Sequence, residues 1–381
     1  MRLRWLTKVL VLIAGCGVCL SCEADGIPRF AYSVNSFNNS ISQFIIDRDA
    51  GRLIPNGLAP SKQFPSAIAV HPSNRFVFAT AQASNELQVY YLDQVSGRLT
   101  QVSSSPIQTN LASSFAITFD PSGRHVYVAG RISNNIMGFE FNPETAELTP
   151  INGMPVATQR RARQFVVHPS GKYLYSVNVY SDTVSAFRIH ESSGALSEMP
   201  GSPYSVGNAP VDIRAPMDDI PEGITQAPYN ITAHPSGDYV FVTNWMSASV
   251  TVFKVNQADG KLTLVEGSPF RSEPHPYDAI VSPDGRYLYS AHWASNTLVG
   301  FEINTKTGKL KRIKADAIAT LGQAPVDLVF QATDNILCVA NYYTHNIASF
   351  RYDPETGLLS LNSSTPTRFG PRSLSVAYGD K

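Results

Sequence analysis

The sequence predicts an all-β protein, a seven-bladed β-propeller whose first blade is closed by the C-terminal strand. Two turn motifs recur at intervals of about 48 residues, which is the length of a four-stranded propeller blade. The segments between the turns are rich in Val, Tyr, Phe and Ile, and none shows a sustained helical period. The first and last segments of the repeat each supply only part of a blade.

The first turn motif is a proline followed by a small polar residue and Gly or Asn. Proline at the second position and glycine at the fourth suit a type I turn. One interval is longer, about 66 residues, and a degenerate copy follows at 331–334. The prolines of the motif are Pro72, Pro121, Pro169, Pro235 and Pro283.

The second turn motif is a glycine followed by any residue and leucine. Glycine suits a hairpin loop that needs a positive φ. Because two unrelated turn signals share one spacing, we count seven units of four strands, A to D from the axis outward. The first residues of the motif are Gly51, Gly97, Ala146, Gly194, Gly260, Gly308 and Gly357.

The two ends of the repeat complement each other. Residues 372–377 resemble a strand A without a strand B, and residues 30–35 resemble a strand B without a strand A. We therefore expect residues 28–381 to form one ring that leaves no open sheet edge. Residues 203–227 form an insertion before the fifth blade, interpreted as a connector, with a lid or an acidic calcium loop as alternatives.

Residues 1–22 are predicted to be an export signal. Basic residues precede a short apolar run, and Ile13-Ala14-Gly15-Cys16 resembles a bacterial lipobox. Lipidation of Cys16 would place the protein at the cell envelope, with a lipid anchor as its only contact with the membrane. The alternative is an ordinary secretory signal that releases the protein to the periplasm or outside, and Cys19 and Cys22 are competing lipid sites.

The candidate site lies at the mouth of the central channel, where each strand A starts and each strand B ends. His71, His168 and His234 belong to the turn motif at the other end, so we assign them structural roles. The charged candidates at the mouth divide into two groups. General-base chemistry is assigned to Asp278 with His275 and His292, and binding of an anionic group to Arg163 and Arg372, with Asp327 as a further ligand contact.

The ends of the B strands supply aromatic and amide groups to the same region. Trp245, Trp293 and Tyr342 follow three consecutive B strands and could stack a sugar or another flat ring. The alternative is that they are wedges packed between blades. The charge balance of zero over the whole chain gives no electrostatic basis for nucleic-acid binding.

The repeated HPSG turns, the asparagines after strand B and the Gly-x-Leu turns resemble the seven-bladed lactonase family. That family includes propeller-type 6-phosphogluconolactonases and carboxymuconate cyclases. The resemblance implies site roles for Arg163, Gln164 and Asn178. Gln164 stands where the family often has histidine, and Val179 stands where it often has an acid.

Two functions are therefore expected. The first is hydrolysis or binding of a small lactone or sugar acid at the channel mouth by an exported monomer, without cofactor or metal. The alternative is a non-enzymatic surface or periplasmic lipoprotein that binds a glycan, a peptide or a host protein. No Ser-His-Asp signature, zinc spacing or phosphate loop favours another enzyme class.

Overall fold

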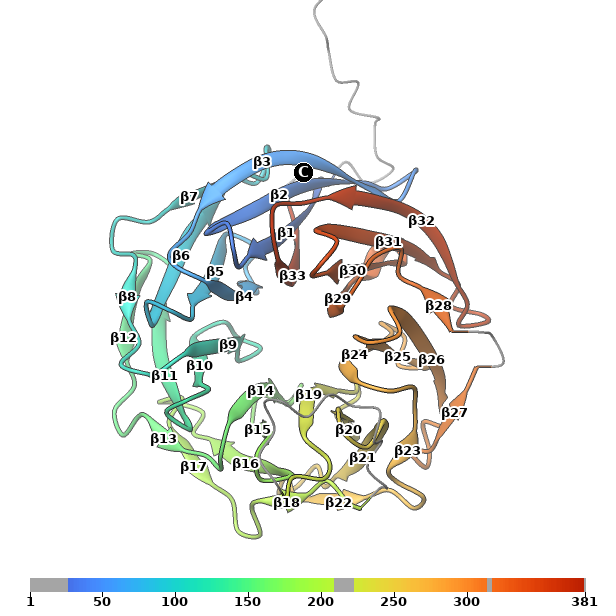
Figure 1. Cartoon of the computed structure of the whole chain (residues 1–381). Coiled ribbons are helices and arrows are strands. Elements are labelled where there is room, and N and C mark those ends of the chain that lie inside the picture. Colours follow the sequence, from blue (N-terminus) through green and yellow to red (C-terminus); the bar gives the residue numbers. More distant parts are fainter. Residues whose placement is uncertain (1–26, 209–222, 314–316, 380–381) are drawn as a thin grey trace, which may run out of the picture.

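Seven β-sheets lie around a central axis in the computed structural model, which describes residues 27–208, 223–313 and 317–379 (Figure 1). This arrangement confirms the predicted all-β propeller. The lipobox cysteine, Cys16, and most of the insertion lie outside the described residues, so those predictions stay predictions. Within the described ranges, no helix is long and apolar enough to cross a membrane.

Each blade has four principal strands, and consecutive strands are antiparallel. The innermost strands, A, are β4 (Pro65–Val70), β9 (Ser114–Phe119), β14 (Ala162–Val167), β19 (Pro228–Ala233), β24 (Pro276–Val281), β29 (Pro325–Gln331) and β33 (Pro371–Tyr378). The B strands are β1 (Arg29–Asn35), β5 (Phe76–Ala81), β10 (His125–Gly130), β15 (Tyr173–Asn178), β20 (Tyr239–Asn244), β25 (Tyr287–His292) and β30 (Ile336–Asn341).

The outer half of each blade is more irregular than the inner half. The C strands are β2 (Ser40–Asp47), β6 (Glu86–Leu92), β11 (Asn135–Asn142), β16 (Thr183–Ile189), β21 (Ser249–Val255), β26 (Thr297–Ile303) and β31 (Asn346–Tyr352). The D strands are β3 (Arg52–Pro60), β7 (Leu99–Gln101), β12 (Glu147–Pro150), β17 (Leu196–Glu198), β22 (Leu262–Leu264), β27 (Leu310–Arg312) and β32 (Leu359–Pro366). In five blades a further short strand pairs with strand C. These strands are β8 (Ile107–Gln108), β13 (Val156–Ala157), β18 (Tyr204–Ser205), β23 (Phe270–Arg271) and β28 (Ile318–Ala319).

The ring closes as the sequence predicts. Strand β33 pairs with β1 in antiparallel register, and Tyr32 lies opposite Ser375. The first blade is therefore built from both ends of the chain, in the order β3-β2-β1-β33. Because every inner strand has a neighbouring blade on both sides, the ring needs no separate cap (Figure 1).

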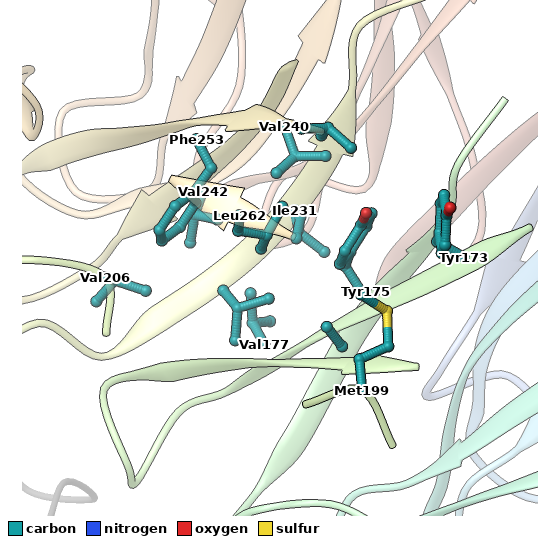
Figure 2. Close-up of a cluster of buried hydrophobic side chains, with 13 residues drawn as sticks. Tyr173, Tyr175, Val177, Met199, Val206, Ile231, Val240, Val242, Phe253 and Leu262 are labelled. Carbon is teal, nitrogen blue, oxygen red and sulfur yellow. The ribbon is translucent and has the colours of Figure 1, made fainter. Parts of the chain in front are cut away.

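The hydrophobic core lies between blades rather than within one. Figure 2 shows one such layer, where Tyr175 and Val177 of β15 pack against Ile231, Val240 and neighbouring side chains of the next blade. Similar clusters lie between the other pairs of blades. Strand B is buried along its whole length in every blade, since its two faces contact different neighbours.

The end opposite the mouth is held by a repeated histidine contact. His71 Nε2 bonds to the Gly123 carbonyl of the next blade at 2.9 Å, and His168 bonds in the same way to Gly237 at 2.8 Å. His234 repeats the contact with Gly285. The structural role predicted for these three histidines is confirmed. The degenerate turn copy forms a short 3₁₀-helix, η1 (Ala332–Asp334), instead.

Candidate functional site

A β-bulge opens the start of every inner strand. In each A–B pair the register shifts by one residue near the mouth, as between Pro276 and Asp278 of β24. The shift recurs in the other six blades. A bulge places two consecutive residues against one residue of the partner strand and changes the direction of a side chain. The second and third residues of each A strand can therefore both face the channel.

These second and third residues line the principal pocket of the described chain. Its volume is about 380 Å³, including the open space at its mouth, and all seven inner strands contribute to it. The pocket thus gathers side chains that are far apart in the sequence. Its lining residues are Ser66, Ala67, Phe115, Ala116, Arg163, Gln164, Asn230, Tyr277, Asp278, Val326, Asp327, Arg372 and Ser373.

The loops at the mouth are fixed by a second repeated contact. In the B–C loop of the β9 blade, Asn134 Oδ1 accepts a hydrogen bond from the Arg161 amide of the next blade at 2.6 Å. Asn296 makes the same contact with the Ala324 amide. Both partners in each pair have positive φ, from 55° to 64°. These contacts hold the entries to the inner strands, and therefore the pocket residues, in place.

Two carboxyl groups form the acidic part of the pocket. Asp278 and Asp327 lie on adjacent inner strands, and both line the pocket. Asp278 Oδ2 also accepts from the Leu328 amide at 2.7 Å, and Asp327 Oδ2 accepts from the Leu374 amide. Each carboxyl group therefore bridges its own blade to the next.

Burial keeps one proton on this carboxyl pair. Burial, followed by the negative charge of Asp327, raises the pKa of Asp278 well above its ordinary value. Burial also raises the pKa of Asp327 to about 7. Two adjacent buried carboxyl groups resist being ionised together, so one acid and one base coexist near neutral pH.

Three arginines surround the ring of Phe115 on the basic side of the pocket. The guanidinium carbons of Arg372, Arg131 and Arg163 lie 5.0, 5.1 and 5.3 Å from the ring centroid. Burial, and then the charges of Arg161 and Arg163, lower the pKa of Arg131 to about 10. Within the described ranges, no salt bridge is formed by these three arginines or by the neighbouring Arg161. Uncompensated positive charge at one place favours an anionic ligand.

Tyr277 connects the basic and acidic sides. Its ring lies 4.4 Å from the Arg163 guanidinium, and Arg163 also bonds to the Tyr229 carbonyl at 2.5 Å. Burial alone would raise the pKa of Tyr277, but the positive charges of Arg163, Arg372 and Arg131 lower it overall. A phenol beside these arginines and in the same pocket as the carboxyl pair is suited to hydrogen-bond a polar ligand.

The structure brings together five of the residues predicted from sequence. Arg163, Gln164, Asp278, Asp327 and Arg372 all line the pocket.

Trp245 and His275 lie beside the pocket rather than in it. Trp245 is 7% exposed and stacks between Tyr229, at 4.8 Å, and His275, at 4.6 Å. Trp245 is therefore one of the packed wedges that the sequence left as an alternative. His275 is 2% exposed and enters β24 with φ of 56°, so it supports the strand rather than facing the channel. Trp293 and Tyr342 are half-buried on the adjoining loops.

The structure does not bring His292 or Asn178 to the pocket. His292 is fully buried, and burial lowers its pKa to about 4. Its Nδ1 donates to the Pro274 carbonyl, and its Nε2 accepts from Ser290 Oγ at 2.8 Å. Asn178 is also buried and donates from Nδ2 to Ser185 Oγ at 2.9 Å. Both side chains terminate strand B inside the blade, so we do not retain them as site residues.

The sequence analysis missed several residues that the bulges bring to the channel. Tyr277 and Ser373 line the pocket, as does Asn230, which the sequence had placed at the start of an inner strand; Arg131, at the end of a B strand, contacts the pocket residue Phe115. A usable signal was present, because five of the seven inner strands begin with proline and the pocket residues are the next two. Those prolines are Pro65, Pro228, Pro276, Pro325 and Pro371.

No group of three or more His, Cys, Asp or Glu side chains arranged to hold a metal ion occurs in the described part of the chain. The single cysteine there, Cys338, is buried within strand β30, where burial raises the pKa of its thiol to about 12. The polar groups that line the pocket are carboxyl, guanidinium, phenol, amide and serine hydroxyl groups.

The chain belongs to the lactonase family of seven-bladed propellers. The family model described as "Lactonase, 7-bladed beta-propeller" matches residues 22–115, 105–214 and 227–373. A 6-phosphogluconolactonase of Bacillus subtilis (strain 168) is 24% identical over 203 residues. That match covers 53% of this chain and only 40% of the relative's own length.

Solved structures show the same architecture. A Bacteroides fragilis protein superimposes with a TM-score of 0.77 at 19% identity, covering 93% of this chain and 99% of that protein. The periplasmic gluconolactonase of Pseudomonas aeruginosa superimposes with a TM-score of 0.75 at 19% identity, covering 92% and 99%. At such identities the similarity establishes the fold alone.

Proposed function

We propose that this protein hydrolyses the lactone of a sugar acid in the pocket at the channel mouth. The observation that carries the proposal is the juxtaposition of the Asp278–Asp327 carboxyl pair with Arg163 and Arg372 in one cavity. The carboxyl pair provides a base and an acid, and the arginines provide positive charge where an oxyanion would form. Relatives that are named as lactonases support the same reaction class.

Each part of the pocket performs one step of the proposed reaction. The ionised carboxylate of the pair accepts a proton from water, and the oxygen of that water bonds to the lactone carbonyl carbon. The arginines stabilise the resulting oxyanion. When the ring C–O bond breaks, the protonated member of the pair donates its proton to the departing alkoxide oxygen. The product is a hydroxy acid, whose carboxylate the arginines then hold until release.

We place this activity in the periplasm or on the envelope surface. The N-terminal pattern ending at Cys16 supports export. The Pseudomonas relative is described as periplasmic, which fits the same compartment. Fractionation of cells that produce the full chain, with Cys16→Ser for comparison, measures both export and lipidation.

The hydrolase proposal is tested by turnover of glucono-δ-lactone near pH 6.5, corrected for spontaneous hydrolysis. Asp278→Asn and Arg163→Gln are each expected to lower kcat/KM by about 100-fold or more. Asp93→Asn is the matched control. Asp93 is an exposed carboxylate in a turn at the end of the propeller opposite the mouth, and it accepts hydrogen bonds from two backbone amides. The control is expected to keep wild-type activity.

Two outcomes would contradict the hydrolase. One is turnover that survives both pocket substitutions, which would place the chemistry elsewhere. The other is no turnover of any sugar-acid lactone together with saturable binding to a glycan or to cells, which would favour the non-enzymatic binding protein.

A further inference from the structure

An exposed aromatic surface borders the pocket on one side of the mouth. We call it the aromatic arc and define it as Phe37, Trp293, Tyr342, Tyr343 and Phe369. Its side chains come from three neighbouring blades. The ring centroids of Phe37 and Tyr342 are 5.5 Å apart. Those of Tyr342 and Tyr343 are 5.4 Å apart, and those of Tyr343 and Trp293 are 5.7 Å apart.

Much of this aromatic surface faces solvent. Phe37 and Phe369 are each 59% exposed, and Tyr343 is 54% exposed. Exposing contiguous aromatic rings costs free energy that a monomer would recover by burying them, so such a surface is a signature of binding.

Hydrogen bonds between loops hold the aromatic arc together. The Phe37 amide donates to the Phe369 carbonyl at 3.3 Å, and the Gly370 amide donates to His345 Nδ1 at 3.1 Å. Gly370 has φ of 73°, and a Cβ there would lie 2.8 Å from the Phe37 ring. The glycine therefore permits the close contact between the two loops. A preformed surface binds a ligand with a smaller entropy cost than a mobile one.

The aromatic arc is continuous with the pocket. Arg372 lines the pocket and lies close enough to Tyr342 for its positive charge to favour the ionised phenol, although burial raises the pKa of Tyr342 overall. The Arg372 guanidinium also lies 5.6 Å from the Phe64 ring, and Phe64 lies 5.7 Å from Phe37. A ligand whose anionic or lactone end occupies the pocket would therefore extend its other end over these rings.

The composition of the surface identifies the chemistry of that extension. Exposed amide and hydroxyl residues lie on the same loops as the rings: Asn38 follows Phe37, Gln63 precedes Phe64, Thr344 follows Tyr343, and Gln323 bonds to Tyr343 and Thr344. Aromatic faces stack on the C–H faces of sugar rings, and amides bond sugar hydroxyls. An aliphatic or lipid partner would leave those amides without partners. The pocket is open at its mouth, so a ligand that enters it can extend over the neighbouring loops.

We infer that the preferred substrate is an oligosaccharide whose terminal unit is the lactone, with the adjoining sugar bound on the aromatic arc. The inference rests on the proposed lactone hydrolysis, and it names the substrate class of that same site. It assigns to Phe37, Tyr343 and Phe369 a role in substrate selection that is separate from bond cleavage.

The experiment compares a monosaccharide with two disaccharides on the full protein. Calorimetry measures binding of gluconate, cellobionate and maltobionate, which are the acid products, and kinetics measures kcat/KM for the three lactones. At least one disaccharide acid is expected to bind about 10-fold more tightly than gluconate. Tyr343→Ala and Phe37→Ala are expected to remove that difference and to leave gluconate binding unchanged. Tyr91→Ala, at an aromatic that is 46% exposed on outer strand β6, is the matched control and is expected to change nothing.

The two readouts separate the two proposals. Equal binding of gluconate and both disaccharide acids, or a preference that survives both arc substitutions, would overturn the inference. Absence of turnover for all three lactones would overturn the hydrolase. In that case a disaccharide preference that depends on Tyr343 would still support the sugar-binding surface.

Discussion

The two ends of this propeller use the same blades in opposite ways. At the end opposite the mouth, the same contacts recur from blade to blade, such as those from His71, His168 and His234 to glycine carbonyls. In the pocket at the mouth, the equivalent positions on successive inner strands differ: the third residue is alanine, glutamine, asparagine, aspartate or serine. Repetition therefore identifies residues that build the ring, and variation at a repeated position identifies residues available for chemistry.

The largest effect is expected from adding a methyl group at the repetitive end. A Cβ at Gly260, where φ is 76°, would lie 2.5 Å from the buried Tyr173 ring. Gly260→Ala should therefore lower the free energy of unfolding by about 3 kcal/mol, from overpacking and a left-handed backbone together. Urea denaturation measures this loss in the free energy of unfolding.

Gly153→Ala separates these two causes. Gly153 has φ of 82°, but nothing lies within 4 Å of a Cβ placed there. The expected loss is about 1 kcal/mol, from the backbone alone. Equal losses in the two variants would mean that the repeated glycines are not required by packing between blades.

A somewhat smaller effect is expected at the mouth, as a dependence of stability on pH. The pKa of Asp327 rises to about 7 on folding because the group is buried, so the folded protein binds its proton more tightly than the unfolded chain. The stabilisation is complete below the ordinary aspartate pKa and is lost as pH rises through about 7. Raising the pH from 5 to 8 should therefore lower the free energy of unfolding by about 2 kcal/mol.

Asp327→Asn isolates this contribution, because asparagine keeps an oxygen that can accept from the Leu374 amide. Thermal unfolding across that pH range should show a shallower decline for the variant than for the wild type. Identical slopes would show that burial does not raise the pKa of Asp327 and would contradict the assignment of a shared proton to the pair.

The smallest effect is expected from removing one hydroxyl at the repetitive end. Tyr175 Oη donates to the Gly260 carbonyl of the next blade at 2.7 Å, and Tyr32, Tyr127 and Tyr289 make the same contact in other blades. Tyr175→Phe should cost about 1 kcal/mol without changing turnover. Tyr91→Phe, at an exposed ring, is the control, and a reduced kcat/KM in Tyr175→Phe would contradict the division between the two ends.

The sequence was sufficient for the ring because turns leave a local signal. Proline and glycine at fixed intervals located every blade, and the unmatched segments 30–35 and 372–377 predicted the closure that β1 and β33 make. The roles of His71, His168 and His234 followed from the same repetition.

The pocket was predicted only in part because bulges break the alternation of strand residues. Asp278 and Arg372 were found because they lie next to strand starts, whereas Tyr277 was missed because alternation assigns it to the other face. His292 was misplaced for a related reason, since the last residue of strand B turns into the blade instead of toward the channel. Such directions depend on packing between blades, which one strand does not encode.

The most direct test of the central claim is a crystal structure of Asp278→Asn soaked with gluconate. The account predicts a carboxylate in the pocket, with its oxygens about 3 Å from guanidinium nitrogens of Arg163 or Arg372. Gluconate bound at another surface while this pocket holds only solvent would contradict it.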